Sequence, residues 1–337
     1  MRILILGGGA FVGRALVEAS LSRGHEVTTV TRTALPKSAT YDRVESIFSD
    51  RTKPDAFDFT KDRQWDAVFD TWFNAPHVVQ KSATALRNHV PYYSYVSSCS
   101  VYNEDPLPIG LNENSPVIEA DPSAERTNYS ADKRGAELAI LESYGANNSF
   151  FARGGMILGP YEIPGRLPWW LKRIARGGEV LAPGPSDLGL QYIDARDLAM
   201  WMVACAEQKI SGAFNSVSPV NHATMSDLLE MCRRITDSDA HFTWMPPDFL
   251  QENDIQPWIE MPIWVSPTLY GIYGINTGKA AKAGLRCRSL IETVVDTWEA
   301  MQSDVQPELN EQMTPPGISA DKEASVLAAW ASKMDNQ

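Results

Sequence analysis

The chain has 337 residues, a formal net charge of −12 and a sequence pI near 4.9. This length suits one large α/β unit or two lobes. An acidic surface repels nucleic-acid phosphates and anionic lipids, so we expect a small-molecule substrate and neither nucleic-acid nor membrane partners. The cysteines form no CxxC pair, the histidines lack metal-ligand spacing and no apolar run is long enough to span a bilayer. We therefore expect free thiols, no metal and a cytoplasmic location.

The first half of the chain alternates short apolar runs with helical patterns, which is typical of a parallel sheet covered by helices. In chain order we expect strand 2–6, helix 11–23, strands 26–31, 44–48 and 66–70, helix 77–88, strand 92–97, a loop over 103–127, helix 129–143 and strand 149–153. The predicted fold is α/β: a Rossmann-type, doubly wound parallel sheet over residues 1–160, completed by segments near 190–218, that binds a dinucleotide.

The composition changes after Gly159-Pro160, where eight of the ten tryptophans and many prolines follow. Residues 161–337 are predicted to form a smaller, loop-rich substrate lobe over the carboxyl edge of the sheet. Within it we expect an irregular stretch at 244–268, a polar tail from about 303 to 323 and a last helix at 323–333. Aromatic walls would suit a small, largely apolar carbonyl or alcohol compound. The tryptophans that could supply them, unless they are core residues, are Trp169, Trp170, Trp258 and Trp264.

A glycine-rich turn joins the first predicted strand to the first predicted helix. Its sequence is Gly7-Gly8-Gly9-Ala10-Phe11-Val12-Gly13. Gly7 allows a tight turn, Gly9 lets the backbone approach a pyrophosphate, and Gly13 lets the helix pack closely on the strand, so that the N-terminal amides of the helix face the anion. We therefore predict that the cofactor contacts Gly7, Gly9, Ala10, Phe11, Val12 and Gly13. The alternative is a turn with only a folding role.

The end of the second predicted strand indicates which dinucleotide is bound. It reads Thr31-Arg32-Thr33, without the acidic residue that would accept the adenosine ribose hydroxyls and repel a 2′-phosphate. The Arg32 guanidinium suits that phosphate, so NADP(H) is preferred over NAD(H), unless Arg32 is a solvated surface residue. Asp50 is expected to accept the adenine amino group, unless it forms an exposed ion pair with Arg51. Further cofactor contacts are predicted at Arg51, Thr71, Gly155 and Met156.

Tyr129 and Lys133 stand four residues apart at the start of a predicted helix, and hence on one helix face. A tyrosine has a reference pKa of about 10, and lowering it to about 7 requires about 4 kcal/mol, which a nearby ammonium and an oxidised nicotinamide could supply. Tyr129 would then exchange a proton with the substrate oxygen while Lys133 holds the cofactor ribose. Ser98, at a strand end, would hydrogen-bond the same oxygen. The alternatives are an ordinary helix surface for Tyr129 and Lys133 and a turn residue for Ser98.

These motifs together resemble the extended and atypical short-chain dehydrogenase/reductases, the NAD-dependent epimerase/dehydratase-like superfamily. The resemblance covers most of the chain: the turn at 7–13, the segment 97–102, the tyrosine–lysine helix, Arg153 before Gly159-Pro160, the segment 192–199, Gly212 to Asn215 and the segment 290–298. It implies that Ser98, four residues before Tyr102, is the active serine beside Tyr129 and Lys133. By resemblance only, it also implies a homodimer through helices 77–88 and 129–143.

Three departures from the family pattern narrow the expected reaction. Ala10 replaces the usual middle glycine, as in the atypical branch. Cys99 and Ser100 stand where the sugar-nucleotide dehydratases carry an Asp-Glu pair for water elimination, which disfavours a dehydratase. Leu190 stands where nucleotide-sugar enzymes tend to carry an arginine that holds the substrate pyrophosphate. The cations that could compensate, although such a cluster is more often a solvated helix face, are Arg166, Lys172, Arg173 and Arg176.

Three functions are compatible with these residues. The first is an NADPH-dependent reductase of a ketone or imine, which Arg32 and the Ser98, Tyr129 and Lys133 set favour. The second is an epimerase that oxidises and re-reduces one carbon without net cofactor turnover, which the order of the motifs favours. The third is a non-catalytic, dinucleotide-binding sensor or scaffold. We disfavour it because such relatives commonly lose the tyrosine or the lysine, and this chain keeps both.

Overall fold

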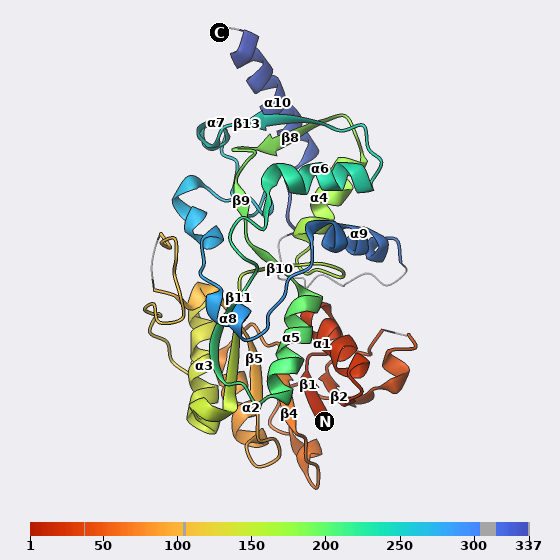
Figure 1. The fold of residues 1–337 in the computed structure, drawn as a ribbon, viewed down its shortest axis with the longest axis vertical. Helices are drawn as coiled ribbons and strands as arrows, with labels where there is room; N and C mark the ends of the chain where they lie inside the picture. The colour runs from red at the N-terminus through yellow and green to blue at the C-terminus, as the bar shows by residue number, and fades with distance from the viewer. Residues whose placement is uncertain (37, 104–105, 304–314, 336–337) are drawn as a thin grey trace.

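A seven-stranded parallel sheet forms the larger domain of this computed structural model, which describes residues 1–36, 38–103, 106–303 and 315–335 (Figure 1). Its strands follow the order β11-β6-β5-β4-β1-β2-β3. Their bounds are β1 (Arg2–Leu6), β2 (Glu26–Thr31), β3 (Glu45–Phe48), β4 (Ala67–Asp70), β5 (Tyr93–Ser98), β6 (Ser149–Gly154) and β11 (Gly212–Ser216). The order 3-2-1-4-5-6 within this sheet is that of a Rossmann fold, so the predicted fold class is confirmed.

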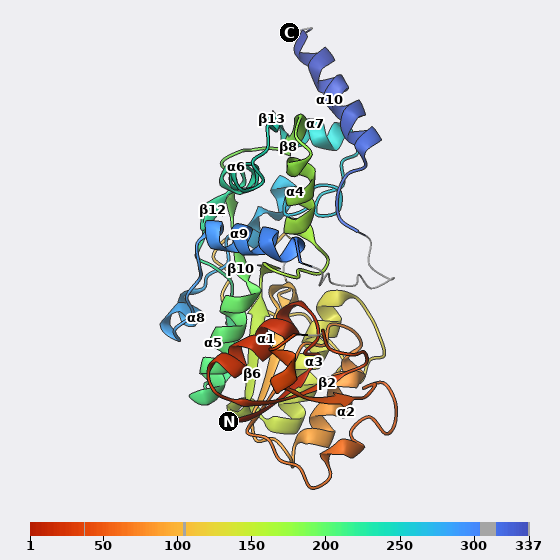
Figure 2. The same cartoon turned by 90° about the vertical axis from the view of Figure 1, so that its right-hand side faces the viewer.

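Helices cover both faces of the sheet because its central strands are apolar on both sides. On one face, α1 (Phe11–Ser22) packs beside α5 (Ala195–Glu207); on the other, α2 (Pro76–Leu86) packs beside α3 (Tyr129–Tyr144) (Figure 2). Along β1, Ile3 and Ile5 belong to the core under α1 and α5, whereas Leu4 and Leu6 belong to the core under α2 and α3. This central strand is therefore fixed between two apolar layers, and the turn after it is held at the carboxyl edge.

The second lobe lies beyond the carboxyl edge of the sheet and ends in a projecting last helix, as both views show (Figure 1, Figure 2). It contains α4 (Arg166–Ala175), α6 (Met225–Ile235) and α9 (Leu290–Met301), with the parallel pair β8 (Glu179–Pro183) and β13 (His241–Met245). Two further strand pairs are β7 (Met156–Leu158) with β10 (Tyr192–Asp194), and β9 (Gly189–Leu190) with β12 (Ala223–Thr224). This lobe has an apolar core of its own, which includes Trp170 and Trp264.

Two elements of the second lobe differ from the expectation drawn from the sequence. The stretch 244–268 is not irregular throughout: it contains the end of β13 and then α7 (Pro247–Glu252), because a proline is tolerated in the first turn of a helix. The last helix, α10 (Ala320–Asp335), is longer than 323–333. Its first turn is docked by the buried Glu323, whose carboxylate accepts hydrogen bonds from the Arg173 guanidinium and the Leu181 amide. Part of the predicted polar tail, 304–314, lies outside the described residues.

Short helices complete the part of the chain that the structure describes. They are η1 (Tyr41–Arg43), η2 (Asp58–Thr60), η3 (Cys99–Val101), η4 (Ala146–Asn148), η5 (Pro267–Tyr273) and α8 (Gly278–Lys282). The helix η3 continues directly from β5, at the carboxyl edge of the sheet, and η2 borders a hollow on the surface. None of the helices in the described ranges is both long enough and apolar enough to cross a membrane.

Candidate active site

The turn after β1 has the geometry of an anion-binding turn. Gly7 has a φ of +104°, in the left-handed region that favours glycine. A Cβ on Gly13 would collide with the Gly7 carbonyl oxygen, so the close contact between α1 and β1 requires glycine there. A Cβ on Gly9 would meet only Leu35 among the described residues within 4 Å, at an ordinary 3.5 Å. Packing within the chain therefore does not require a glycine at position 9, whereas close approach of a ligand would.

The first turn of α1 leaves its backbone amides open to an anion. Its N-cap residue is Ala10, which has no side-chain hydrogen bond to the first-turn amides. The helix dipole and these amides are therefore available to an anion. Ala10 is exposed and Phe11 is half-buried, whereas Val12 and Gly13 are buried. Because the Val12 side chain belongs to the core under α1 and α5, Val12 would contact a cofactor through its backbone.

Three residues predicted to bind the adenosine half have different surroundings. Arg32, just after β2, is exposed. Hydrogen bonds from the amide and hydroxyl of Thr52, at 3.0 and 2.8 Å, lower the pKa of Asp50, and the positive charge of Arg32 adds to this effect. Arg51 is only 5% exposed and forms a bidentate ion pair with Asp70, with N–O distances of 2.7 and 2.6 Å. The exposed Asp50–Arg51 ion pair that we considered is therefore wrong, because the Arg51 side chain points into the interior.

The ends of β4 and β6 lie at the same edge of the sheet as the glycine turn. Three of the predicted cofactor contacts follow these strand ends directly: Thr71, Gly155 and Met156. The Thr71 hydroxyl donates a hydrogen bond to the Leu6 carbonyl oxygen at 3.1 Å. A Cβ on Gly155 would approach the Val217 side chain to 2.7 Å, so this position accommodates little more than glycine. Met156 is buried and begins β7. Ligands of doubly wound folds bind at this carboxyl edge of the sheet.

Ser98 and Tyr129 are brought together from two elements that are far apart in the sequence. Ser98 is the last residue of β5, and Tyr129 is the first residue of α3, whose N-cap Asn128 accepts a hydrogen bond from the Ala131 amide at 2.9 Å. The Ser98 hydroxyl lies close enough to the Tyr129 phenol to lower its pKa. Ser98 Oγ also accepts hydrogen bonds from the amide and hydroxyl of Ser100, at 3.1 and 2.9 Å. Because these bonds engage both acceptor positions of Ser98, its own proton is left to be donated to a further acceptor.

The protein groups around the Tyr129 phenol keep it protonated near neutral pH. Burial around its hydroxyl raises the pKa of Tyr129, although 52% of the residue is exposed. The Ser98 hydroxyl and the positive charge of Arg166 oppose this rise without reversing it. Lys133 lies 5.9 Å from the Tyr129 ring. The pKa is thus raised, whereas we expected Lys133 and an oxidised nicotinamide together to lower it.

Lys133 is a buried cation held by backbone carbonyl groups. It is 3% exposed, and its ammonium donates hydrogen bonds to the carbonyl oxygens of Trp72 and Val96, at 2.8 and 2.7 Å. Burial lowers the pKa of Lys133 to about 7, and the nearby carboxylates of Asp70, Glu137 and Asp132 oppose this effect. An ammonium has three N–H groups, so two fixed bonds leave one for another acceptor.

The structure places Arg166 near Tyr129, a position that the sequence did not predict. It is the first residue of α4 in the second lobe, and its charge reaches Tyr129 of the sheet domain. The expectation of a solvated cluster on this helix is wrong at two positions: Arg173 is buried against Glu323, and Arg166 pairs with the buried Glu162. Trp170 and Trp264 are core residues, at 0% and 2% exposure, whereas Trp258 is 36% exposed.

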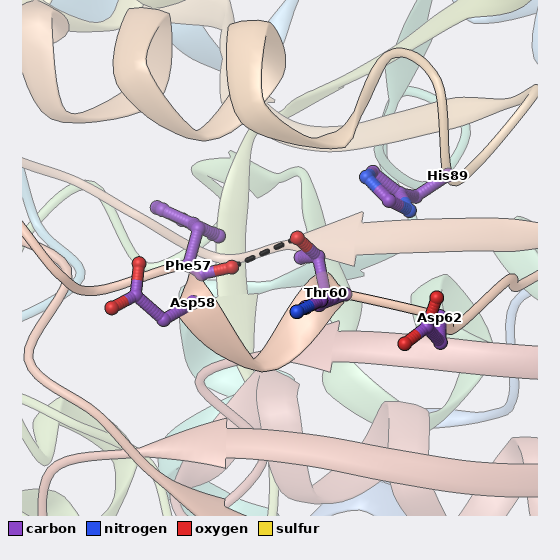
Figure 3. Close-up of a pocket in the computed structure, with 6 residues that line it drawn as sticks. Phe57, Asp58, Thr60, Asp62 and His89 are labelled. Atoms are coloured by element: carbon purple, nitrogen blue, oxygen red, sulfur yellow. Dashed lines mark hydrogen bonds between the residues drawn. The ribbon is translucent and has the colours of Figure 1, made fainter.

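A surface hollow of about 670 Å³ lies away from these residues (Figure 3). The Thr60 hydroxyl donates a hydrogen bond to the Phe57 carbonyl oxygen at 2.8 Å within it. The His89 carbonyl oxygen accepts the amide of Trp65, which precedes β4, so the hollow lies at the amino ends of the strands. Its lining contains none of the predicted site residues and consists of Phe57, Asp58, Thr60, Lys61, Asp62 and His89.

The fold and this set of residues define a Rossmann-type enzyme of the short-chain dehydrogenase/reductase class. The profile of the NAD dependent epimerase/dehydratase family matches residues 3–216, and the chain belongs to that family. A curated relative, the epimerase family protein SDR39U1 of Bos taurus, is 26% identical over 239 residues, which cover 67% of this chain and 78% of the relative. The predicted family is therefore confirmed.

Solved structures agree with the fold. A putative epimerase from Burkholderia cenocepacia superposes with a TM-score of 0.68 at 18% identity, covering 89% of this chain and 98% of that one. The UDP-glucose 4-epimerase of Thermus thermophilus, solved in complex with NAD, gives a TM-score of 0.64 at 19% identity, covering 90% of this chain and all (100%) of that one. At these identities the likeness shows the fold alone.

Proposed function

We propose that this chain is a nicotinamide-dependent reductase that acts on a carbonyl group of a small metabolite with a largely apolar skeleton. The observation that carries this proposal is the Ser98–Tyr129 hydroxyl pair, one helical turn from the buried Lys133, at the carboxyl edge of the sheet. A bound nicotinamide supplies the hydride. Reduction of a carbonyl also requires a proton donor, and a phenol whose pKa is raised is a donor at neutral pH.

Each of the three residues has a separate task in this proposal. Ser98, with its acceptor positions engaged by Ser100, donates a hydrogen bond to the substrate carbonyl oxygen and polarises it. Tyr129 gives its proton to the same oxygen. Lys133 is fixed by two backbone carbonyl groups, so that its remaining N–H can bind a cofactor ribose hydroxyl and its charge can stabilise the phenolate that remains.

The neighbours of Ser98 support a reductase over a dehydratase. Burial raises the pKa of Cys99 to about 12, so its thiol is neither a base nor an acid of useful strength at neutral pH. The Ser100 hydroxyl is engaged with Ser98. Leu190, at the position of the expected pyrophosphate-binding arginine, is completely buried (0% exposed). These residues do not provide the acid and base that elimination of water requires.

Epimerisation is the second candidate, and the family match favours it. An epimerase would remove and return a hydride at one carbon with no net change in the cofactor. It requires Tyr129 as a phenolate in the first step, so the charges of Lys133 and of an oxidised nicotinamide would have to offset the burial that raises the pKa of Tyr129. Isomerisation of a substrate without any change in nicotinamide absorbance would favour epimerisation over reduction.

For the cofactor we propose NADP(H). The exposed Arg32 follows β2, and no acidic residue stands at the end of that strand. The Asp50 carboxylate is close enough to Arg32 for the two charges to interact, which would hold the guanidinium at the adenosine end. NAD(H) is the alternative; the solved structure of the Thermus relative holds NAD.

The proposal is tested by following oxidation of NADPH with a panel of aromatic and aliphatic ketones. We expect Tyr129→Phe to lower kcat/KM by about 10²- to 10⁴-fold, because the proton donor is removed. Tyr144→Phe is the matched control: Tyr144 is the last residue of the same helix and packs against Tyr93, far along α3 from Ser98. A fully active Tyr129→Phe enzyme would refute the catalytic assignment.

The homodimer through α2 and α3 stays a prediction. These helices pack side by side on one face of the sheet. Light scattering after size-exclusion chromatography would measure the mass of the particle in solution. A monomer over the whole measured concentration range would contradict the prediction.

A further inference from the structure

Two hydrogen bonds fix one edge of the Arg166 guanidinium. It is bonded through Nε to Oε1 of Glu162 at 2.9 Å and through Nη2 to the Ile157 carbonyl oxygen at 3.2 Å. The Glu162 carboxylate is buried, and it also accepts the amides of Arg166 and Leu167 at the start of α4, at 3.1 and 3.0 Å. The charge of Glu162 is therefore shared with the N-terminus of a ten-residue helix. Arg166 keeps a positive charge that Glu162 compensates only in part.

One nitrogen of Arg166 has no hydrogen-bond partner among the residues that the structure describes. Within the described ranges, Nη1 makes no hydrogen bond, whereas Nε and Nη2 are both engaged. The arginine side chain is 13% exposed. A planar guanidinium that is fixed on one edge and free at the other is prepared to bind an oxygen anion, because little conformational freedom remains to be lost.

Trp258 forms a flat wall beside this guanidinium. Its ring lies 5.1 Å from the Arg166 Cζ atom, within the range of a cation–π contact. Trp258 has a φ of +66°, a conformation that costs free energy for a bulky residue, and its amide is bonded to the Trp264 carbonyl oxygen at 2.9 Å. The backbone thus holds a large aromatic side chain partly exposed (36%), while its neighbours Trp170 and Trp264 fill the core.

The same guanidinium lies close to the catalytic end of the sheet. Ile157, whose carbonyl oxygen binds Arg166, comes three residues after Gly154, and Gly154 pairs in register with Ser98. The Ile157 side chain lies against Gly154: a Cβ there would be 3.2 Å from Ile157 Cδ1. The positive charge of Arg166 also acts on the pKa of Tyr129. Arg166 is therefore within electrostatic reach of the Tyr129 phenol and in contact with Trp258.

We propose that Arg166 and Trp258 form a substrate subsite for a carboxylate carried on a flat aromatic or conjugated skeleton, next to the carbonyl that Tyr129 protonates. The guanidinium binds the carboxylate through Nη1, and the indole packs against the flat skeleton. This inference rests on the proposed function for the identity of the reacting group. It names a substrate class: aryl or conjugated oxo acids, in preference to neutral ketones. In a chain with a net charge of −12, one fixed cation beside the site would make anion binding local and specific.

The test compares an acid with its neutral ester. Benzoylformate and methyl benzoylformate are titrated against the full-length enzyme with NADP⁺ present, and binding is measured by calorimetry. We expect the wild type to bind the acid more tightly than the ester. Arg166→Met should reduce that acid-to-ester preference by about 10- to 100-fold, the loss of one charge-assisted contact. Arg176→Met is the matched control, since Arg176 is an exposed arginine at the other end of α4, and it should keep the preference.

Two further variants separate the possible outcomes. Arg166→Lys keeps a cation beside Glu162 and should retain part of the preference, which guards against a folding defect in Arg166→Met. Trp258→Leu should weaken acid and ester alike. An unchanged acid-to-ester ratio in Arg166→Met, or no saturable binding of the acid to the wild type up to about 10 mM, would overturn the inference.

The binding measurement tests the subsite independently of the proposed reaction. Tyr129→Phe should keep the acid-to-ester preference of the wild type while losing turnover. If binding depends on Arg166 but no carbonyl compound is ever reduced, the subsite stands and the proposed reductase function fails. If ketones are reduced in a Tyr129-dependent way with no preference for the acid, the reductase stands and the subsite fails.

Discussion

The two halves of the molecule hold the charged residues near the predicted site in different ways. Beneath the predicted site, the sheet domain buries charges: Arg51 with Asp70, and Glu137 with Arg153 at 2.9 Å. The second lobe also buries one such pair, Arg173 with Glu323, and the largest side chains of its apolar core are Trp170 and Trp264. One cation from each half, Lys133 and Arg166, illustrates the difference in how charges are held. Lys133 of the sheet domain is buried among backbone carbonyl groups, whereas Arg166 of the second lobe keeps one edge free.

This difference indicates separate roles for the two halves, catalysis in the sheet domain and substrate preference in the second lobe. Buried and fully bonded polar groups hold a fixed arrangement, which suits a proton donor and its neighbours. An apolar core holds a platform whose few accessible residues can differ between related enzymes without disturbing the chemistry. We therefore expect substitutions in the sheet domain to change reaction and stability together, and substitutions at Trp258 or Arg166 to change substrate preference first.

The largest effect should come from the core of the second lobe. Trp264→Ala removes a 2%-exposed side chain and leaves the Gly184 carbonyl oxygen without its indole N–H, so we expect a loss of about 5 kcal/mol in the free energy of unfolding. Trp258→Ala should cost less than about 1 kcal/mol, since that ring is accessible. Urea denaturation measures both. Equal losses would break the distinction between a core and a substrate-facing tryptophan.

A somewhat smaller effect is expected beneath the active site. Asp70→Asn leaves the Arg51 charge buried without a counter-charge, and we expect a loss of about 3 kcal/mol in the free energy of unfolding, the low end for a broken buried pair because the amide oxygen can still accept a hydrogen bond. Asp296→Asn, which weakens a partly exposed pair with Arg196, is the control and should cost less than about 1 kcal/mol. A stable Asp70→Asn protein would show that the polar interior is not required for the fold.

The pH dependence of stability should reveal Lys133. Its pKa is about 7 in the folded chain against 10.5 for an unperturbed lysine, so between these values the unfolded chain binds more protons. The stability of the wild type relative to Lys133→Met should therefore be lowest below pH 7 and rise with pH through this window, by at most about 1.4 kcal/mol per pH unit. Urea denaturation of both proteins across the window measures the difference. A difference that does not change with pH would show that Lys133 keeps an ordinary pKa.

The smallest effect is expected at the adenosine end. Arg32→Ala should weaken NADP(H) binding by about tenfold, because one charge-assisted contact to the 2′-phosphate is lost, and should leave NAD(H) binding nearly unchanged. Fluorescence titration with both cofactors measures the ratio. Equal weakening for both cofactors would assign Arg32 to a general role and would remove the basis for preferring NADP(H).

The sequence by itself determined the features that depend on neighbouring residues. The glycine turn can be recognised within one short stretch of sequence that contains a strand, a turn and a helix. The tyrosine and the lysine share a helix face because they are four residues apart. The strands and helices of the first half were therefore predictable within a few residues at their ends. Prolines misled the prediction at 244–268, where Pro247 opens a helix rather than a loop.

Only the tertiary structure decided which residues of distant elements meet. It paired Arg51 with Asp70, brought Ser98 close to Tyr129, buried Trp170 and Trp264, and placed Arg166 within electrostatic reach of Tyr129 and beside Trp258. Spacing along the chain carries no signal for such contacts, because each depends on how a strand end, a helix start and a loop of the second lobe pack in space. Burial then set the pKa values of Tyr129 and Lys133, since desolvation depends on every surrounding element.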